Sequence, residues 1–215
     1  MILQDRVTQL YYREGTYDVQ IFREIKRCYG LLDVRGKVVL DIGANIGGFT
    51  DYALKAGARR VVGYEPSREN FDLLKRNITD NRATLHNCAV TNKKVRRVTF
   101  YKSMGVNYGI GSTEPHRGRD TYEVAAENFY AILGKLRPQV IKIDVEGAEY
   151  DILSNLTTQP LGAYVKQIAM EIHLNRRTWR NDLGPALIKK FNAWRAVKQP
   201  HIGASNWTTI GVWRR

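Results

Sequence analysis

VVLDIGANIGGFT, at residues 38–50, joins a run of apolar residues to a turn that contains Gly43, Gly47 and Gly48. The apolar run predicts a buried strand that ends near Asp41, and the residues from about Gly47 onward predict a helix. Such a turn brings backbone close to a ligand, because glycine leaves room for the approach. The residues of the turn therefore indicate what kind of ligand the protein binds.

Two common phosphate-binding turns do not match this stretch. A dinucleotide turn has the pattern G-x-G-x-x-G, and Asn45 stands where its second glycine would be. The carboxylate of Asp41 would also repel a pyrophosphate, and the G-K-[ST] of a nucleoside-triphosphate loop is absent. A ligand with a cationic amine, a short carboxylate and a ribose fits better. Asp41 would face the amine, and the helix beginning at Gly47 would favour the carboxylate.

Residues at the ends of the two strands predicted next would bind the remaining groups of this ligand. Glu65 ends the segment RVVGYE, where its carboxylate can accept hydrogen bonds from both ribose hydroxyls. Asn87, or the backbone of Cys88 and Ala89 beside it, would meet a purine. S-adenosylmethionine combines these groups, so it is the predicted cofactor. Its predicted binding residues are Asp41, Gly43, Asn45, Gly47, Glu65, Asn87 and Ala89.

Predicted strands alternate with helices along most of the chain. The expected strands lie at residues 37–42, 60–65, 83–90, 96–102, 121–126, 139–145 and 167–173. This alternation predicts an α/β fold with a mostly parallel sheet covered by helices on both faces. The final residues resemble two strands joined by a turn, which would add one antiparallel strand. We expect one domain, with a helical extension at 1–30 and a Rossmann-like core at 37–215.

Five polar residues follow or end the predicted strands. In parallel sheets, ligands bind beyond the carboxyl ends of the strands, so these side chains should converge on one edge. They are Asp41, Glu65, Asn87, Asp144 and His173.

Charge and composition indicate where the protein acts and the charge of its partners, but they do not identify a substrate. Thirty-four Lys and Arg against 21 Asp and Glu give a net charge of +13, which favours anionic partners such as phosphorylated metabolites, acidic glycans or nucleic acid. No apolar segment is long enough to span a membrane, and the first residues do not resemble a signal peptide. Two cysteines are too few for a disulfide framework. These observations predict a cytoplasmic protein without a membrane span.

Several motifs together resemble one family. VVLDIGANIGGFT, GYEPSRENFDLLKRNI, NCAV, VIKIDVEGAEYDIL and MEIH occur in the order and spacing of the FkbM-type family of S-adenosylmethionine-dependent methyltransferases. The resemblance covers residues 37–175 and implies a class I methyltransferase fold, with a seven-stranded sheet that has one antiparallel strand. It also implies methyl transfer to oxygen, usually a hydroxyl on a sugar, a glycolipid or a small natural product. Residues 1–30 and 176–215 carry little resemblance.

The family motifs fall on residues already singled out. Asp41, Gly43, Asn45, Gly47 and Glu65 match its cofactor motifs, and Asp144, Glu146, Gly147 and Glu149 match its second signature.

The expected catalytic residues are Asp144, Glu146 and, as a weaker candidate, His173. Methyl transfer to a hydroxyl needs a group that removes the proton, and a carboxylate or a neutral histidine can do so. Glu149 is equally consistent with a charge placed at a helix start, and Lys142 with a side chain that reaches out to solvent. With Glu171, the three candidates could also hold a divalent metal, but their spacing is not diagnostic and no metal is expected.

Two other functions remain open. A nucleic-acid methyltransferase acting on a ribose 2′-hydroxyl or a base would use the basic runs at 93–97 and 176–180, together with Trp179, Trp194, Trp207 and Trp213. Against it, the residues after the central strand read DVEG, without the prolines usual in enzymes that methylate base amino groups. A non-catalytic basic binding module on the same fold is the third hypothesis, and it predicts cofactor binding without turnover.

Overall fold

The computed structural model describes residues 1–102, 111–113, 115, 118, 120–156, 161–173, 187–191, 194–198 and 208–215. In chain order the elements are β1 (Ile2–Gln4), β2 (Tyr11–Arg13), α1 (Asp18–Tyr29), β3 (Val38–Ile42), α2 (Gly48–Lys55), β4 (Arg60–Tyr64), α3 (Arg68–Asn77), β5 (Ala83–His86), β6 (Ala89–Thr91), β7 (Arg97–Tyr101), β8 (Thr121–Asn128), α4 (Phe129–Leu136), β9 (Val140–Ile143), α5 (Glu149–Ile152), β10 (Gln167–His173), β11 (Arg195–Lys198) and β12 (Thr208–Arg214).

A central sheet organises the molecule. Its strand order is β11-β12-β10-β9-β3-β4-β5. The strands from β10 to β5 pair in parallel, whereas β12 is antiparallel to both β10 and β11. The expectation of a mostly parallel α/β sheet is therefore confirmed. The chain leaves β3 towards β4 on one side and later returns to β9 on the other, which makes the β3–β9 boundary a topological switch point.

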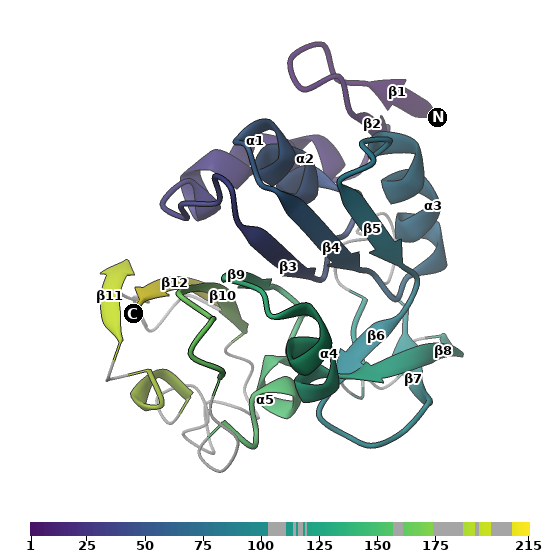
Figure 1. Ribbon diagram of the computed structural model, residues 1–215. Helices are drawn as coiled ribbons and strands as arrows, with labels where there is room; N and C mark the ends of the chain where they lie inside the picture. Colours follow the sequence, from purple (N-terminus) through teal and green to yellow (C-terminus); the bar gives the residue numbers. More distant parts are fainter. Residues whose placement is uncertain are drawn as a thin grey trace.

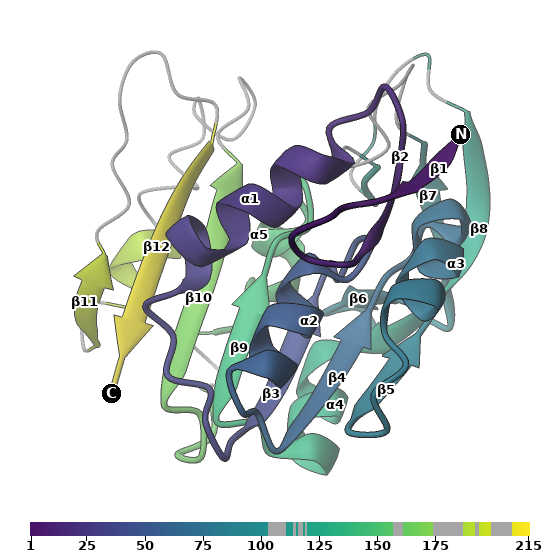
Figure 2. The ribbon, with the colours of Figure 1, turned by 90° about the horizontal axis from the view of Figure 1, so that it is seen from above.

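Helices cover both faces of this sheet. Figures 1 and 2 show α1, α2 and α3 on one face and α4 and α5 on the other. Side chains alternate accordingly: Val39 and Val140 belong to the core beneath α1 and α2, whereas Leu40 and Ile141 belong to the core on the opposite face. The same alternation places the residue after Leu40 and the residue after Ile141 on the α1 face. None of the helices in the described part of the chain has the length and apolar character needed to span a bilayer.

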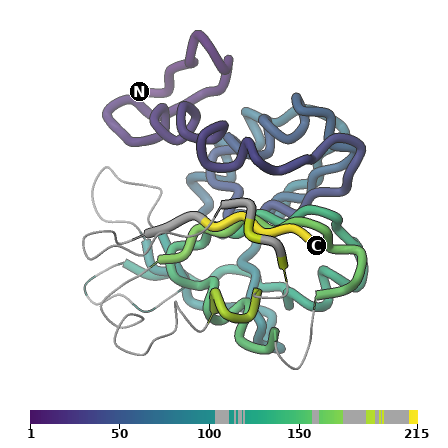
Figure 3. The backbone as a smooth tube through the Cα atoms, turned by 90° about the vertical axis from the view of Figure 1, so that its left-hand side faces the viewer, coloured from purple at the N-terminus to yellow at the C-terminus, as the bar shows by residue number. Residues whose placement is uncertain are grey.

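The N-terminal extension at 1–30 is helical only in its second half, where α1 lies. Its first part is an antiparallel ribbon of β1 and β2, and helix α1 begins at Asp18. In Figure 3 the purple start of the chain lies at the top of the molecule. Arg13, at the end of β2, forms a buried ion pair with Asp18 at 2.8 Å and donates a hydrogen bond to Asn70 of α3. These bonds fix the ribbon and the start of α1 against the core, so the extension packs on the sheet domain.

The third predicted strand, at 83–90, is two strands in two different sheets. β5 pairs with β4 in the central sheet, whereas β6 pairs in parallel with β8, and β7 runs antiparallel to β8 in a separate three-stranded sheet. The break falls at Asn87, whose side-chain amide donates hydrogen bonds to the carbonyls of Glu65 and Pro66. Only the polar pair His86 and Asn87 marks the break, and apolar residues resume at Cys88, so the sequence alone does not reveal that the two strands belong to different sheets.

Candidate active site

A cavity of about 320 Å³ lies at the carboxyl ends of β4 and β9, beside the glycine turn after β3 and one face of α1. A volume of this order is typical of small-ligand sites. Six of the residues expected from the sequence border it: Gly43, Asn45, Glu65, Ala89, Asp144 and Glu146. The other four, Asp41, Gly47, Asn87 and His173, belong to the described residues but are not among those that border the cavity.

The glycine turn packs against the end of β9. Gly43 has φ +78°, and a Cβ there would lie 1.7 Å from the carbonyl oxygen of Asp144, so no other residue fits. Asn45 also has a left-handed backbone, with φ +52°. Its buried Oδ1 has no hydrogen-bond partner among the described residues, and Asn45 borders the cavity. A ligand that donates a hydrogen bond would satisfy this oxygen.

Glu65 is held by the backbone around the cavity. Its carboxylate accepts hydrogen bonds from the N–H groups of Asn45 and Ser67, each at 2.8 Å. Burial raises the pKa of Glu65 to about 7, although these two donors act in the opposite direction. Asn87 supports Glu65 by donating to its carbonyl oxygen at 2.8 Å, while the neighbouring Ala89 borders the cavity. Glu65 is thus placed to accept hydrogen bonds from a ligand, and Asn87 fixes the loop that carries it.

Lys142 links the glycine turn to two carboxylates. Its Nζ donates a 2.6 Å hydrogen bond to the carbonyl of Gly43 and lies 3.4 Å from Asp41 Oδ1 and 3.5 Å from Asp144 Oδ2. Burial opposes the charge of Lys142, but the attraction of Asp41 and Asp144 outweighs it and raises the pKa of the ammonium. Lys142 is only 3% exposed, so it is not the solvent-directed side chain that the sequence suggested.

Asp41 lies beneath the turn. It is fully buried, accepts a 2.7 Å hydrogen bond from Thr50 Oγ1 and stands opposite Lys142 in the β3–β9 register. Its carboxylate faces Thr50 and Lys142, and Asp41 is not among the residues that border the cavity. We therefore expect an indirect role for Asp41 in place of the predicted direct contact with a ligand amine. Lys142 connects Asp41 to the turn, because its ammonium contacts both Asp41 and the carbonyl of Gly43. The missed signal was the sheet alternation, which puts residues 41, 142 and 144 on one face.

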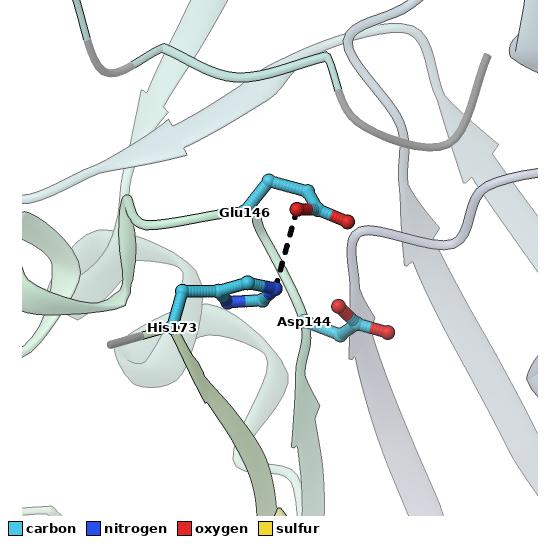
Figure 4. Close-up of side chains that lie close together, drawn as sticks. All are labelled: Asp144, Glu146 and His173. Atoms are coloured by element: carbon cyan, nitrogen blue, oxygen red, sulfur yellow. Dashed lines mark ion pairs between the residues drawn. The ribbon is translucent and has the colours of Figure 1, made fainter. Parts of the chain in front are cut away.

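His173 forms a buried charge cluster with two glutamates (Figure 4 shows the pair with Glu146). Its Nε2 lies 3.3 Å from Glu146 Oε2, and its Nδ1 lies 3.3 Å from Glu149 Oε1. Burial disfavours the imidazolium, but the charge of Glu149 and the hydrogen bonds to both glutamates prevail and raise the pKa of His173 well above its usual range. A raised pKa disfavours the neutral imidazole that a base requires, so we expect His173 to hold Glu146 in place and not to act as the predicted base.

Glu149 has more contacts than a helix-start charge requires. It is fully buried and accepts hydrogen bonds from the N–H groups of Gly147 at 2.9 Å and His173 at 2.6 Å. It therefore ties the end of β10 to the loop after β9. Glu146 lies in that loop with φ +54°, a backbone conformation that is strained for a residue with a side chain.

The cluster also bears on metal binding. One ligand atom from each of Asp144, Glu146 and His173 lies within 4.8 Å of the others, and Figure 4 shows the three side chains converging. Carboxylate and imidazole groups at this spacing are chemically able to hold a divalent cation, provided that the imidazole has lost its proton.

Only part of the proposed nucleic-acid surface lies among the described residues. The run at 93–97 is exposed, whereas 176–180 and Trp207 lie outside the described residues. Trp213 is buried and stacks on Phe191, and Trp194 makes an edge contact with the same ring. These two tryptophans pack within the protein.

Comparison with known proteins finds a matching family model and two similar methyltransferases. The family model for the methyltransferase FkbM domain matches residues 41–197. The 31-O-demethyl-FK506 methyltransferase FkbM of Streptomyces tacrolimicus is 28% identical over 197 residues, which span 71% of this chain and 74% of that protein. A probable histone-arginine methyltransferase 1.4 of Arabidopsis thaliana is 27% identical over 146 residues, which span 66% of this chain but only 26% of the plant protein.

Solved structures show the same fold. A putative S-adenosylmethionine-dependent methyltransferase from Listeria monocytogenes aligns with a TM-score of 0.52 and 12% identity, covering 92% of this chain and 99% of that one. Magnesium protoporphyrin IX methyltransferase from Synechocystis PCC 6803, solved with bound S-adenosylmethionine, aligns with a TM-score of 0.51 and 11% identity, covering 99% and 86%. At such identities the likeness concerns the fold alone, and it confirms the expected class I methyltransferase architecture.

Proposed function

The chain belongs to the FkbM methyltransferase family, and from this premise we propose that it transfers the methyl group of S-adenosylmethionine to a hydroxyl of a sugar, a glycolipid or a small natural product. The observation that carries the proposal is the cavity, where the buried carboxylate of Glu65 and the carboxylates of Asp144 and Glu146 border one space. The relative from Streptomyces tacrolimicus is named as a methyltransferase of 31-O-demethyl-FK506, and this supports transfer to oxygen.

The cavity suits S-adenosylmethionine on the side of the glycine turn. The residues that border it there are Gly43, Asn45, Glu65 and Ala89. A ligand group that donates a hydrogen bond would satisfy the buried Oδ1 of Asn45. Glu65 would accept hydrogen bonds from the ribose hydroxyls. Asp41, Gly47 and Asn87 would act indirectly, by holding the turn and the Glu65 loop in place.

Asp144 and Glu146 would serve the acceptor. In the transfer, the hydroxyl oxygen forms a bond to the methyl carbon while the carbon–sulfur bond breaks, and its electron pair stays on sulfur to give S-adenosylhomocysteine. The hydroxyl proton passes to a carboxylate and then to water, and both Asp144 and Glu146 border the cavity where this occurs. Protonated His173 would hold Glu146 in place.

The charge of the cavity differs from that of the whole chain. Although the net charge is +13, five carboxylates border the cavity: Glu24, Glu65, Asp144, Glu146 and Glu171. Such a lining suits the positive sulfonium and amine of the donor and an uncharged hydroxyl. An anionic group on the acceptor, which the net charge favours, would lie outside this cavity.

Transfer of a labelled methyl group into a fractionated cell extract tests the proposal. We expect label from S-adenosylmethionine in a small-molecule or glycan fraction, as a methyl ether that survives alkali and nuclease. S-adenosylhomocysteine, the reaction product, should suppress it. Label that nuclease releases would instead support a nucleic-acid acceptor, and S-adenosylmethionine binding without any label would support a binding module.

A further inference from the structure

Helix α1 contributes a residue to the site from outside the segment that the family model matches. Tyr29, the last residue of α1, precedes residues 41–197, is 3% exposed and borders the cavity. Its hydroxyl donates a 3.1 Å hydrogen bond to Asp144 Oδ2, a residue 115 positions further along the chain.

The phenol ring is fixed in this orientation. It packs edge-on against Phe49 of α2, with ring centroids 5.3 Å apart, and the Lys142 ammonium lies 5.7 Å from the centre of its ring. Burial, followed by the charge of Asp144, raises the pKa of Tyr29 well above its usual range. The phenol therefore keeps its proton and acts as the donor.

Tyr29 and Lys142 meet the same oxygen of Asp144. The hydroxyl lies 3.1 Å and the ammonium 3.5 Å from Oδ2. We propose that Tyr29 is a positioning residue for methyl transfer: together with Lys142 it fixes Oδ2 of Asp144, so that the other oxygen of this carboxylate faces the acceptor hydroxyl. This inference rests on the proposed function, and it makes the N-terminal helix part of the reaction site.

Tyr29→Phe removes the hydroxyl and keeps the ring contacts. Tyr164→Phe is a matched control, because Tyr164 donates a 2.9 Å hydrogen bond to the carbonyl of Leu133 and does not border the cavity. In the labelled-methyl assay at saturating S-adenosylmethionine, Tyr29→Phe should lower the rate about tenfold, the size expected for one lost hydrogen bond to a charged group. Its Kd for S-adenosylmethionine, measured by calorimetry, should stay within about twofold of wild type. Tyr164→Phe should change neither.

The pH profile separates positioning from a structural role. Because a hydrogen-bond donor favours the ionised form of a carboxylate, its removal should move the acid limb of the rate profile to higher pH in Tyr29→Phe but not in Tyr164→Phe. A wild-type rate and profile in Tyr29→Phe would overturn the inference, and so would a Kd about tenfold weaker, which would make Tyr29 a cofactor-binding residue. Absence of label with the wild-type protein is a different result, since it overturns the proposed function itself and the inference with it.

Discussion

At the scale of single residues, the ammonium of Lys142 joins the parts of the site. It contacts the carbonyl of Gly43 and the carboxylates of Asp41 and Asp144, three groups that come from β3, the turn after it and the end of β9. A buried carboxylate such as Asp41 is costly unless a partner compensates its charge. Lys142 is that partner, so we expect it to stabilise the fold as well as the shape of the turn.

Lys142→Met should therefore lower the free energy of unfolding by about 3–5 kcal/mol, the usual cost of leaving a buried charge without its partner. Urea denaturation measures this change. Lys75→Met is the control, because Lys75 forms an exposed ion pair with Asp72 at 3.0 Å, and its loss should cost less than about 1 kcal/mol. Equal stability of the two variants would contradict the role given to Lys142.

The raised pKa of Glu65, about 7, predicts a pH dependence of cofactor binding. The ionised carboxylate accepts more hydrogen bonds than the acid, so S-adenosylmethionine should bind more weakly as the pH falls below about 7. Calorimetry across this range measures the effect. Glu65→Gln should bind weakly with little pH dependence there, and a constant wild-type affinity from about pH 6 to 8 would contradict the prediction.

Glu65 gives the stability of the unliganded protein a pH dependence opposite to that of cofactor binding. Because the pKa of Glu65 is raised on folding, from 4.5 to about 7, the native state binds the proton more tightly than the unfolded chain does. The Glu65 contribution is therefore fully present below about pH 4.5 and is lost as the pH rises through about 7. Denaturation of Glu65→Gln should lack this loss.

At His173, charge balance predicts the effect of removing metals. Glu146 and Glu149 raise the pKa of His173 well above its usual range, so a metal ion would have to displace a proton from the ring before it could bind there. Methyl transfer should therefore continue at the same rate in EDTA. A loss of activity in EDTA that Mg²⁺ restores would instead assign Asp144, Glu146 and His173 to a cation.

At the scale of elements, the glycine turn lies so close to the end of β9 that adding one methyl group at Gly43 should impair both cofactor binding and stability. In Gly43→Ala the new Cβ would overlap the carbonyl oxygen of Asp144, so we expect loss of S-adenosylmethionine binding together with lower stability. Gly134 in α4 is the control, since a Cβ there meets nothing within 4 Å. Gly134→Ala should stabilise the protein by up to about 1 kcal/mol and leave binding intact. Normal binding by Gly43→Ala in calorimetry would show that the turn is not the cofactor site.

The main elements could be predicted because their signals are local. The apolar runs of β3, β4 and β9 and the glycines after β3 lie within short stretches, and parallel strands bring their carboxyl ends to one edge. The break between β5 and β6 was not predictable, because it depends on the hydrogen bonds of Asn87 to the loop after β4. The β1–β2 ribbon was missed as well, since two three-residue strands carry little periodicity.

At the scale of the whole molecule, the site combines residues from the N-terminal helix to β10. Glu65 and Asp144 were predictable from their places at strand ends, and both border the cavity. Tyr29 was not predictable, because only the folded chain brings the end of α1 beside Asp144. The role of Lys142 follows from the alternation along β9 only once it is known which face of the sheet α1 covers. The contrast between a net charge of +13 and a carboxylate-lined cavity has the same cause: composition is a property of the whole chain, whereas the cavity collects particular residues.

We propose that Asp144 acts in methyl transfer and does not hold the methyl donor. The most direct test compares wild type with Asp144→Asn in two measurements, the Kd for S-adenosylmethionine by calorimetry and the rate of labelled-methyl transfer at saturating donor. We predict a Kd within about twofold of wild type and a rate lower by about 100-fold or more, the range expected when a proton-accepting group is lost. Transfer at the wild-type rate by Asp144→Asn would show that Asp144 does not accept the proton.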